Sequence, residues 1–94
     1  MCMNFYCHVC GFDQGVDAPW GESGLDPSFT ICDCCGVEYG YEDCTSTGVA
    51  KYRSEWLASG SKWQNPKARP FQWSLATQLQ QIPAKLPAGI KQPA

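Results

Sequence analysis

Two stretches in the first half of the chain alternate between apolar and polar residues, as half-buried strands do. Residues 28–31 read Ser-Phe-Thr-Ile, and residues 37–44 carry Val, Tyr and Tyr at every second position from residue 37. An aromatic pair at residues 5–6 is typical of a further short strand. The pattern predicts short antiparallel strands within residues 1–45.

The second half of the chain changes to a helical period. The apolar stripe of a first helix consists of Val49, Tyr52, Trp56 and Leu57. Ser46 or Thr47 is placed to cap its N-terminus, and Gly60 lies where the residue after the C-terminal cap is expected. A second, shorter helix is predicted between its cap, Ser74, and Pro83, with a stripe of Leu75, Leu79 and Ile82. Neither helix is long enough to be stable alone in water, so both are expected to pack on other parts of the chain.

The remaining segments have the composition of loops. Residues 13–27 are dense in Gly, Pro and Asp, and residues 84–94 contain few large apolar residues, which predicts an extended, weakly held tail. At 94 residues the chain is predicted to be one domain, with a ribbon in 1–45, a helical extension in 46–83 and the tail.

The strongest chemical signal is a pair of Cys-x-x-Cys-Gly turns. They contain Cys7, Cys10 and Gly11, then Cys32, Cys35 and Gly36, and 21 residues lie between Cys10 and Cys32. Two such turns supply four thiolates to one tetrahedral metal ion, and the Gly that follows each turn is free to adopt a positive φ. The spacing predicts a small metal-stapled α+β fold with one metal held by Cys7, Cys10, Cys32 and Cys35. Zinc suits a closed site of this kind, and iron binds the same four thiolates.

Three further cysteines stand outside this set: Cys2, Cys34 and Cys44. In the second turn only Cys32 and Cys35 reproduce the two-residue gap and the following Gly, so Cys34 is predicted to be the spare. The alternative to a metal site is a set of disulfides or unliganded buried thiols. The odd count of seven cysteines and the absence of a secretory signal argue against disulfides.

Charge is divided unevenly along the chain. Residues 1–50 hold eight acidic residues and no Lys or Arg, whereas residues 51–94 hold seven basic residues and only Glu55, so the halves carry −8 and +6. In one interpretation, the charged side chains of the two halves pair with each other or face solvent. In the other, the acidic half attracts a charged partner. Trp20, flanked by Asp17, Glu22 and Asp26, either covers the metal site or serves as an anchor for such a partner.

Catalytic residues are not apparent in the sequence. The only His is His8, which lies inside a cysteine turn and is expected at the surface or beside the metal ligands. Without a second His the common nucleophile–base pairs cannot form, and a site closed by four cysteines has no position for a substrate. The protein is therefore not expected to be an enzyme.

A longer pattern runs through Cys7-x-x-Cys10-Gly11-Phe12, then Pro27-Ser28-Phe29-x-Ile31-Cys32-x-Cys34-Cys35-Gly36-x-Glu38-Tyr39-Gly40-Tyr41-x-Asp43, then Tyr52-Arg53-x-x-Trp56-Leu57-x-x-Gly60 and Trp63. In these residues the chain resembles small bacterial zinc-ribbon proteins of the cysteine-rich "CPCC" type, which are mostly uncharacterised and include candidate immunity proteins of toxin systems. The two turns alone also resemble rubredoxin. His8 and Asp33 stand where Pro is usual in such turns.

Three functions are compatible with these features. The first is a non-catalytic zinc ribbon that binds a protein, with neutralisation of a basic toxin as the role that the resemblance implies. The second is a rubredoxin-like iron electron carrier. The third is a nucleic-acid-binding ribbon using Lys51, Arg53, Lys62, Lys67 and Arg69 with Trp63 and Trp73, which the negative net charge disfavours. No stretch is apolar enough to span a bilayer and the start lacks the features of a signal peptide, so a cytoplasmic location is expected.

Overall fold

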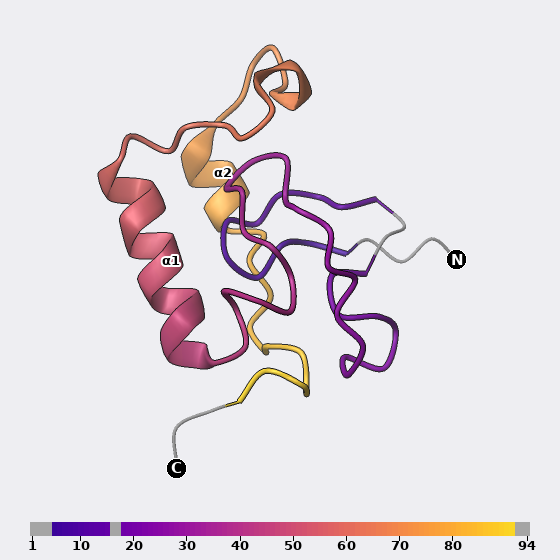
Figure 1. Ribbon diagram of the computed structural model, residues 1–94. Coiled ribbons are helices and arrows are strands. Elements are labelled where there is room, and N and C mark those ends of the chain that lie inside the picture. Colours follow the sequence, from indigo (N-terminus) through magenta and orange to yellow (C-terminus); the bar gives the residue numbers. More distant parts are fainter. Residues whose placement is uncertain (1–4, 16–17, 92–94) are drawn as a thin grey trace.

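The computed structural model describes residues 5–15 and 18–91, and the predicted roles of Cys2 and Asp17 lie outside these residues. Three helices follow one another in the second half: α1 (Ser46–Ala58), the short 3-10 helix η1 (Pro66–Ala68) and α2 (Leu75–Leu79). The first half is built from turns and loops that lie beside α1 (Figure 1).

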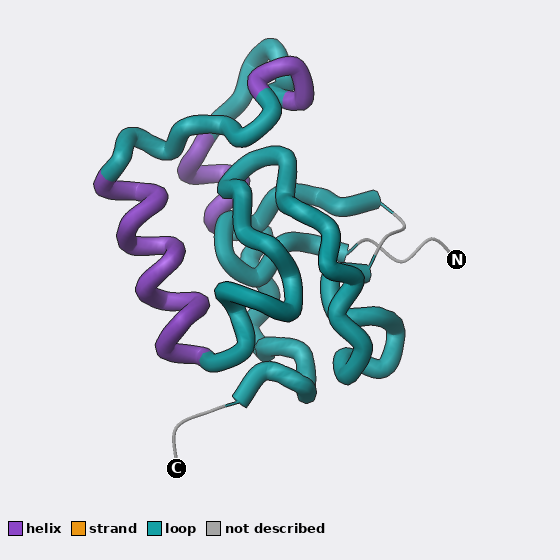
Figure 2. Tube along the Cα trace, viewed as in Figure 1, coloured by secondary structure: helices purple, strands orange, loops and turns teal. Residues whose placement is uncertain are grey.

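The predicted antiparallel strands do not form in the described residues, which appear as loop throughout the first half (Figure 2). Each cysteine turn is closed by a single antiparallel bridge instead, Tyr6 with Asp13 and Ile31 with Glu38. The second pairing stops because Gly40, at φ +90°, and the bond from Tyr41 N to Glu38 O turn the chain away. The α+β prediction is therefore right for the helices and wrong for the sheet.

The N-cap of helix α1 lies one residue before Ser46, so the prediction of Ser46 or Thr47 as the cap is wrong. Thr45 is the N-cap, and its Oγ1 accepts a hydrogen bond from Gly48 N at 2.9 Å. At the other end Gly60 has φ +101° and donates to Leu57 O, while Ser61 N donates to Trp56 O at 2.9 Å. This pair of bonds is a Schellman motif, which confirms the predicted role of Gly60.

The predicted apolar stripe of α1 faces the core at three of its four positions. Val49 and Trp56 are buried and Tyr52 is half-buried, whereas Leu57 is exposed. Helix α2 is capped by Ser74 as predicted, but it ends at Leu79, and residues 80–82 continue as turns. Ile82 therefore lies beyond the helix.

The tail is packed rather than weakly held as far as Lys91. Ile90 is buried, Gly89 N donates to Gly24 O at 2.7 Å, and Lys91 forms a parallel bridge with Thr45 at the start of α1. The core thus combines the sulfur atoms of both turns with apolar side chains from the loop, α1 and the tail. None of the helices in the described residues has the length and apolar character needed to cross a membrane.

Candidate metal centre

The two cysteine turns have the same backbone geometry. In the first knuckle, residues 6–13, Cys7 N donates to Phe12 O at 2.8 Å and Gly11 N donates to Cys7 O at 2.8 Å. The second knuckle, residues 31–38, repeats both bonds between the corresponding residues, at 2.9 Å and 3.0 Å. Each turn therefore presents its two cysteines from a tight loop that its own backbone closes.

Glycine is required in both knuckles, as the sequence predicts. Gly11 has φ +85° and Gly36 has φ +82°, which L side chains rarely adopt. Gly11 also lies against α2, because a Cβ atom there would be only 2.0 Å from the carbonyl oxygen of Gln78. The first knuckle and α2 can approach this closely only because residue 11 has no side chain.

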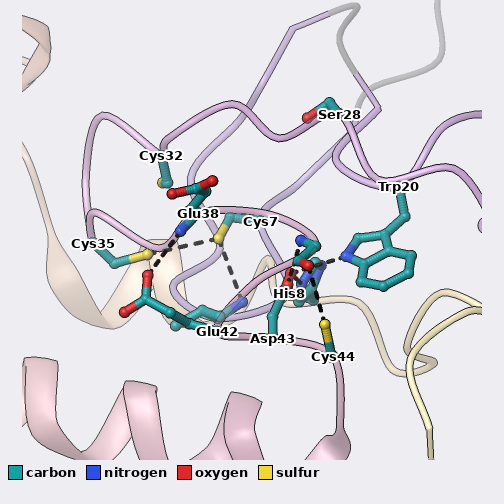
Figure 3. Close-up of polar contacts among 12 residues, drawn as sticks. Cys7, His8, Trp20, Ser28, Cys32, Cys35, Glu38, Glu42, Asp43 and Cys44 are labelled. Atoms are coloured by element: carbon teal, nitrogen blue, oxygen red, sulfur yellow. Dashed lines mark hydrogen bonds and ion pairs between the residues drawn. The ribbon is translucent and has the colours of Figure 1, made fainter.

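The structure brings together the four cysteines that the spacing predicts as ligands. Cys7, Cys10, Cys32 and Cys35 are buried, and their sulfur atoms all lie within 4.8 Å of one another. The sulfur atoms of Cys7 and Cys35 are 3.9 Å apart (Figure 3), and those of Cys10 and Cys32 are 3.7 Å apart. A tetrahedral ion with metal–sulfur bonds of about 2.3 Å separates its ligands by about 3.8 Å, so these four thiols fit one metal ion.

Cys34 and Cys44 lie outside this cluster. Cys34 is buried and receives a hydrogen bond on its sulfur from Gln78 Nε2 at 3.2 Å, and the same amide donates to Cys10 O. Cys44 is exposed, and its thiol donates to Gly40 O. All six cysteines among the described residues are free thiols, so the disulfide alternative has no support there.

The cluster has the electrostatics of a cation site. The pKa of Cys10 is raised, first by its hydrogen bond with Cys32 and then by the other sulfurs around it and by burial. The same bond with Cys10 lowers the pKa of Cys32. Thiols this close share protons because several adjacent negative charges repel, and a bound cation is what allows all four to ionise.

Several polar groups surround the sulfur atoms. Val9 N donates to the sulfur of Cys7 at 3.4 Å, and Gln14 Nε2 donates to that of Cys32 at 3.5 Å. Burial, followed by the charge of Cys7 and its other sulfur neighbours, raises the pKa of Tyr39, so its phenol stays protonated. Its buried hydroxyl has no hydrogen-bond partner within the described residues and is available as a donor to these thiolates.

A buried ionic network supports the first knuckle. His8 Nε2 lies 2.5 Å from Asp43 Oδ2, and the same oxygen accepts a hydrogen bond from Trp20 Nε1 at 2.9 Å, while Gly40 N donates to Oδ1 (Figure 3). Burial acts to raise the pKa of Asp43, but the bonds from His8, Trp20 and Gly40 outweigh it and lower the pKa. Asp43 therefore remains a carboxylate that ties three separate segments together.

This network settles the roles of two residues. His8 lies beside the metal ligands, with its side chain buried, so it is not at the surface. Trp20 is only 6% exposed and its indole N–H is bonded inside, so the prediction that it anchors a partner is wrong. The sequence identified Asp43 only as one residue of a longer pattern, and it gave no sign that its carboxylate would bond to His8 and Trp20.

Helix α1 is attached to the same knuckle by Arg53. Its Nε and Nη2 atoms donate to the carbonyl oxygens of Val9 and His8, both at 2.6 Å. The guanidinium fork thus satisfies two carbonyls of the loop that carries Cys7 and Cys10. The nucleic-acid-binding alternative included Arg53 among its contact residues, whereas in the structure two of its nitrogen atoms donate to backbone carbonyls inside the fold.

Comparison with known proteins identifies two distant relatives. The chain is 27% identical to the uncharacterised protein YozI of Bacillus subtilis, in an alignment that covers 70% of this chain and 67% of that protein. It is 26% identical to the uncharacterised protein YoaQ of the same organism, over 70% of this chain and 68% of that protein. No protein-family model and no solved structure matches it. The chain is thus a cysteine-rich protein with a four-thiol cluster placed to bind a metal ion, and a distant homologue of two uncharacterised bacterial proteins.

Proposed function

We propose that this protein is a small zinc-stapled module that binds another protein and has no catalytic activity of its own. The observation that carries the proposal is the burial of four thiols whose sulfur atoms fit one tetrahedral ion. A structural zinc ion contributes apparent binding energy of about 10 kcal/mol or more, which becomes folding energy when the site exists only in the folded chain.

Zinc is the metal that this site favours. All four ligands are thiolates from two matched knuckles, and Cys35 is the most exposed of them at 7%. A buried site in which protein ligands fill four positions is typical of structural zinc and offers no position for a water molecule or substrate. When bound, zinc would supply charge neutralisation and a covalent cross-link between the knuckles.

The non-catalytic role is supported by the position of His8. It is the only His in the chain, its Nε2 atom faces Asp43, and its side chain is 1% exposed. A general base must come within hydrogen-bond distance of the proton that it removes. His8 is instead held inside the fold, where it supports the first knuckle.

Exposed apolar side chains on the surface of this small fold support a role in protein binding. Several large apolar side chains are exposed although the core is small, among them Leu25, Phe29, Ile31, Tyr41 and Phe71. Clusters of exposed apolar residues on small soluble proteins mark interaction sites. Neutralisation of a toxin is one specific form of protein binding, and the sequence resemblance is its support. It is tested by identifying the protein that the chain binds.

Metal analysis and partner capture test the proposal together. Freshly purified protein is expected to contain one zinc ion per chain and to show no visible absorption, whereas a ferric tetrathiolate would be coloured and would favour the electron carrier. The zinc-loaded chain should retain a host protein that, once purified, rebinds it in a 1:1 complex. A Cys32→Ser variant serves as the control that lacks a complete site. Failure of the zinc-loaded chain to bind any host protein, or metal content near zero, would contradict the proposal.

A further inference from the structure

Three large apolar side chains around the second knuckle are exposed to solvent. The exposed fractions are 62% for Phe29, 52% for Ile31 and 73% for Tyr41. We call these three residues the second-knuckle patch. Leaving three such side chains in water forgoes the stabilisation that their burial would give, so an exposed cluster of this kind is itself informative.

The three residues are carried by two segments of backbone that lie next to each other. Ile31 pairs with Glu38 across the knuckle, and Tyr39 N donates to Thr30 O at 3.1 Å, so the chains before and after the knuckle run side by side. One residue further on, the ring of Phe29 lies against Gly40, because a Cβ atom on Gly40 would be 2.7 Å from Phe29 Cε1. Tyr41 follows Gly40 directly.

The backbone of Phe29 is strained. Its φ is +59°, a left-handed conformation that glycine and asparagine adopt readily and that aromatic residues rarely adopt. Non-glycine residues in this conformation persist where the surrounding structure imposes it, and they concentrate at binding sites. Here the strain accompanies a ring that is mostly in solvent.

Three carboxylates lie beside the patch residues along the chain, and that of Glu42 accepts a hydrogen bond from Glu38 N at 3.1 Å. Glu38 lies opposite Ile31, Glu42 follows Tyr41, and Asp33 is exposed two residues after Ile31. Residues 1–50 contain no Lys or Arg, and within the described residues these three carboxylates make no ion pair. A negative rim around apolar side chains repels nucleic acids and anionic membranes and attracts a positively charged protein surface.

We propose that the second-knuckle patch is the docking surface of this protein, and that its partner presents Lys or Arg side chains around an apolar contact. This inference rests on the proposed protein-binding function and names the surface that performs it. The aromatic rings supply the buried contact of the complex, and the carboxylates steer association.

The test uses isotope-labelled, zinc-loaded protein and a defined probe. The probe is a twelve-residue peptide rich in Lys that carries one Leu-Phe pair, and the control probe replaces each Lys with Glu. Nuclear magnetic resonance shifts on titration should move at residues 29–42 with the basic peptide only. Phe29→Asn keeps an allowed backbone, and together with Tyr41→Ser it should weaken binding at least about tenfold.

Phe71 offers the matched control. Phe71 is 99% exposed, and it lies three residues after η1, far from the patch in sequence. Phe71→Ser should change the dissociation constant less than about twofold. Neutralising the rim with Asp33→Asn and Glu38→Gln should reduce both affinity and its salt dependence, without changing the zinc content.

Three results of the titration would overturn the docking surface: no binding of the basic peptide, shifts that map to residues 62–73, and an equal response to the two peptides. If a purified partner binds the chain at another place, the patch assignment fails while the proposed function stands. If no protein binds anywhere, the proposed function itself fails.

Discussion

Gly11 and Gly36 show how much of the metal centre depends on single residues. Both have positive φ, and each follows the second ligand of its knuckle. They differ in their surroundings: a side chain at position 11 would meet the backbone of Gln78, whereas one at position 36 would meet the end of the Gln64 side chain at 2.8 Å. Backbone cannot move aside as a long side chain can.

Replacing Gly60, Gly36 or Gly11 with Ala should therefore lower the free energy of unfolding by increasing amounts. Gly60→Ala, with φ +101° and no contact within 4 Å among the described residues, should cost about 1–2 kcal/mol for the strained backbone alone. Gly36→Ala should cost slightly more, and Gly11→Ala more than about 3 kcal/mol, because α2 must shift. Denaturant unfolding of the zinc-loaded proteins measures the order. Equal losses at positions 11 and 60 would contradict the close contact with α2.

The four cysteines of the repeated motif and most residues with local roles could be predicted from the sequence, whereas other residues with distant partners could not. The glycines of the knuckles, the cap at Ser74 and Gly60 after α1 all act within a few positions, so their patterns identify them. Asp43 lies 35 positions from His8, and Gln78 lies 68 positions from Cys10. Alternation placed Phe29 and Ile31 on a strand, but it did not show that both would face solvent.

At the scale of elements, α1 is tied to the first knuckle by Arg53. Arg53→Met removes two donors from the carbonyls of His8 and Val9 and should cost about 2–3 kcal/mol. Arg53→Lys keeps the charge but loses the fork, so we expect about half that loss. Lys51→Met, on the exposed side of α1, is the control and should stay within about 0.5 kcal/mol. A loss at Arg53 no larger than at Lys51 would show that the fork contributes nothing.

Asp43 joins the 18–27 loop to the first knuckle through Trp20 and His8. Asp43→Ala leaves two buried N–H groups without their acceptor and should cost at least about 3 kcal/mol, and Trp20→Phe, which removes one donor, about 1 kcal/mol. Because both changes act on one network, their effects should not add. A double-mutant cycle measures this coupling by denaturant unfolding. Strict additivity would mean that Trp20 and Asp43 stabilise the fold independently.

At the scale of the whole molecule, the four-thiol cluster takes the place of the sheet that the sequence led us to expect. Within the described residues the first half has isolated bridges only, and α1 buries just Val49 and Trp56. A helix of 13 residues is marginal alone in water, so α1 depends on the core that the knuckles form. The fold therefore relies on the four thiolates more than on its secondary structure.

Removal of the metal should unfold the whole chain. A strong zinc chelator is expected to abolish the near-ultraviolet circular dichroism of the buried Trp and Tyr residues and most of the helical signal in the same transition. Re-addition of one equivalent of zinc under reducing conditions should restore both. Retention of a cooperative thermal transition after chelation would show that the apolar core suffices without the metal.

The most direct test of the metal centre is the metal stoichiometry of the protein and of paired cysteine variants, measured by native mass spectrometry. We expect one metal per chain, retained in Cys34→Ser, whose thiol lies outside the cluster, and lost in Cys35→Ser, whose thiol lies inside it. Loss of the metal from Cys34→Ser with retention in Cys35→Ser, or no metal in the unaltered chain, would show that the ligand assignment is wrong.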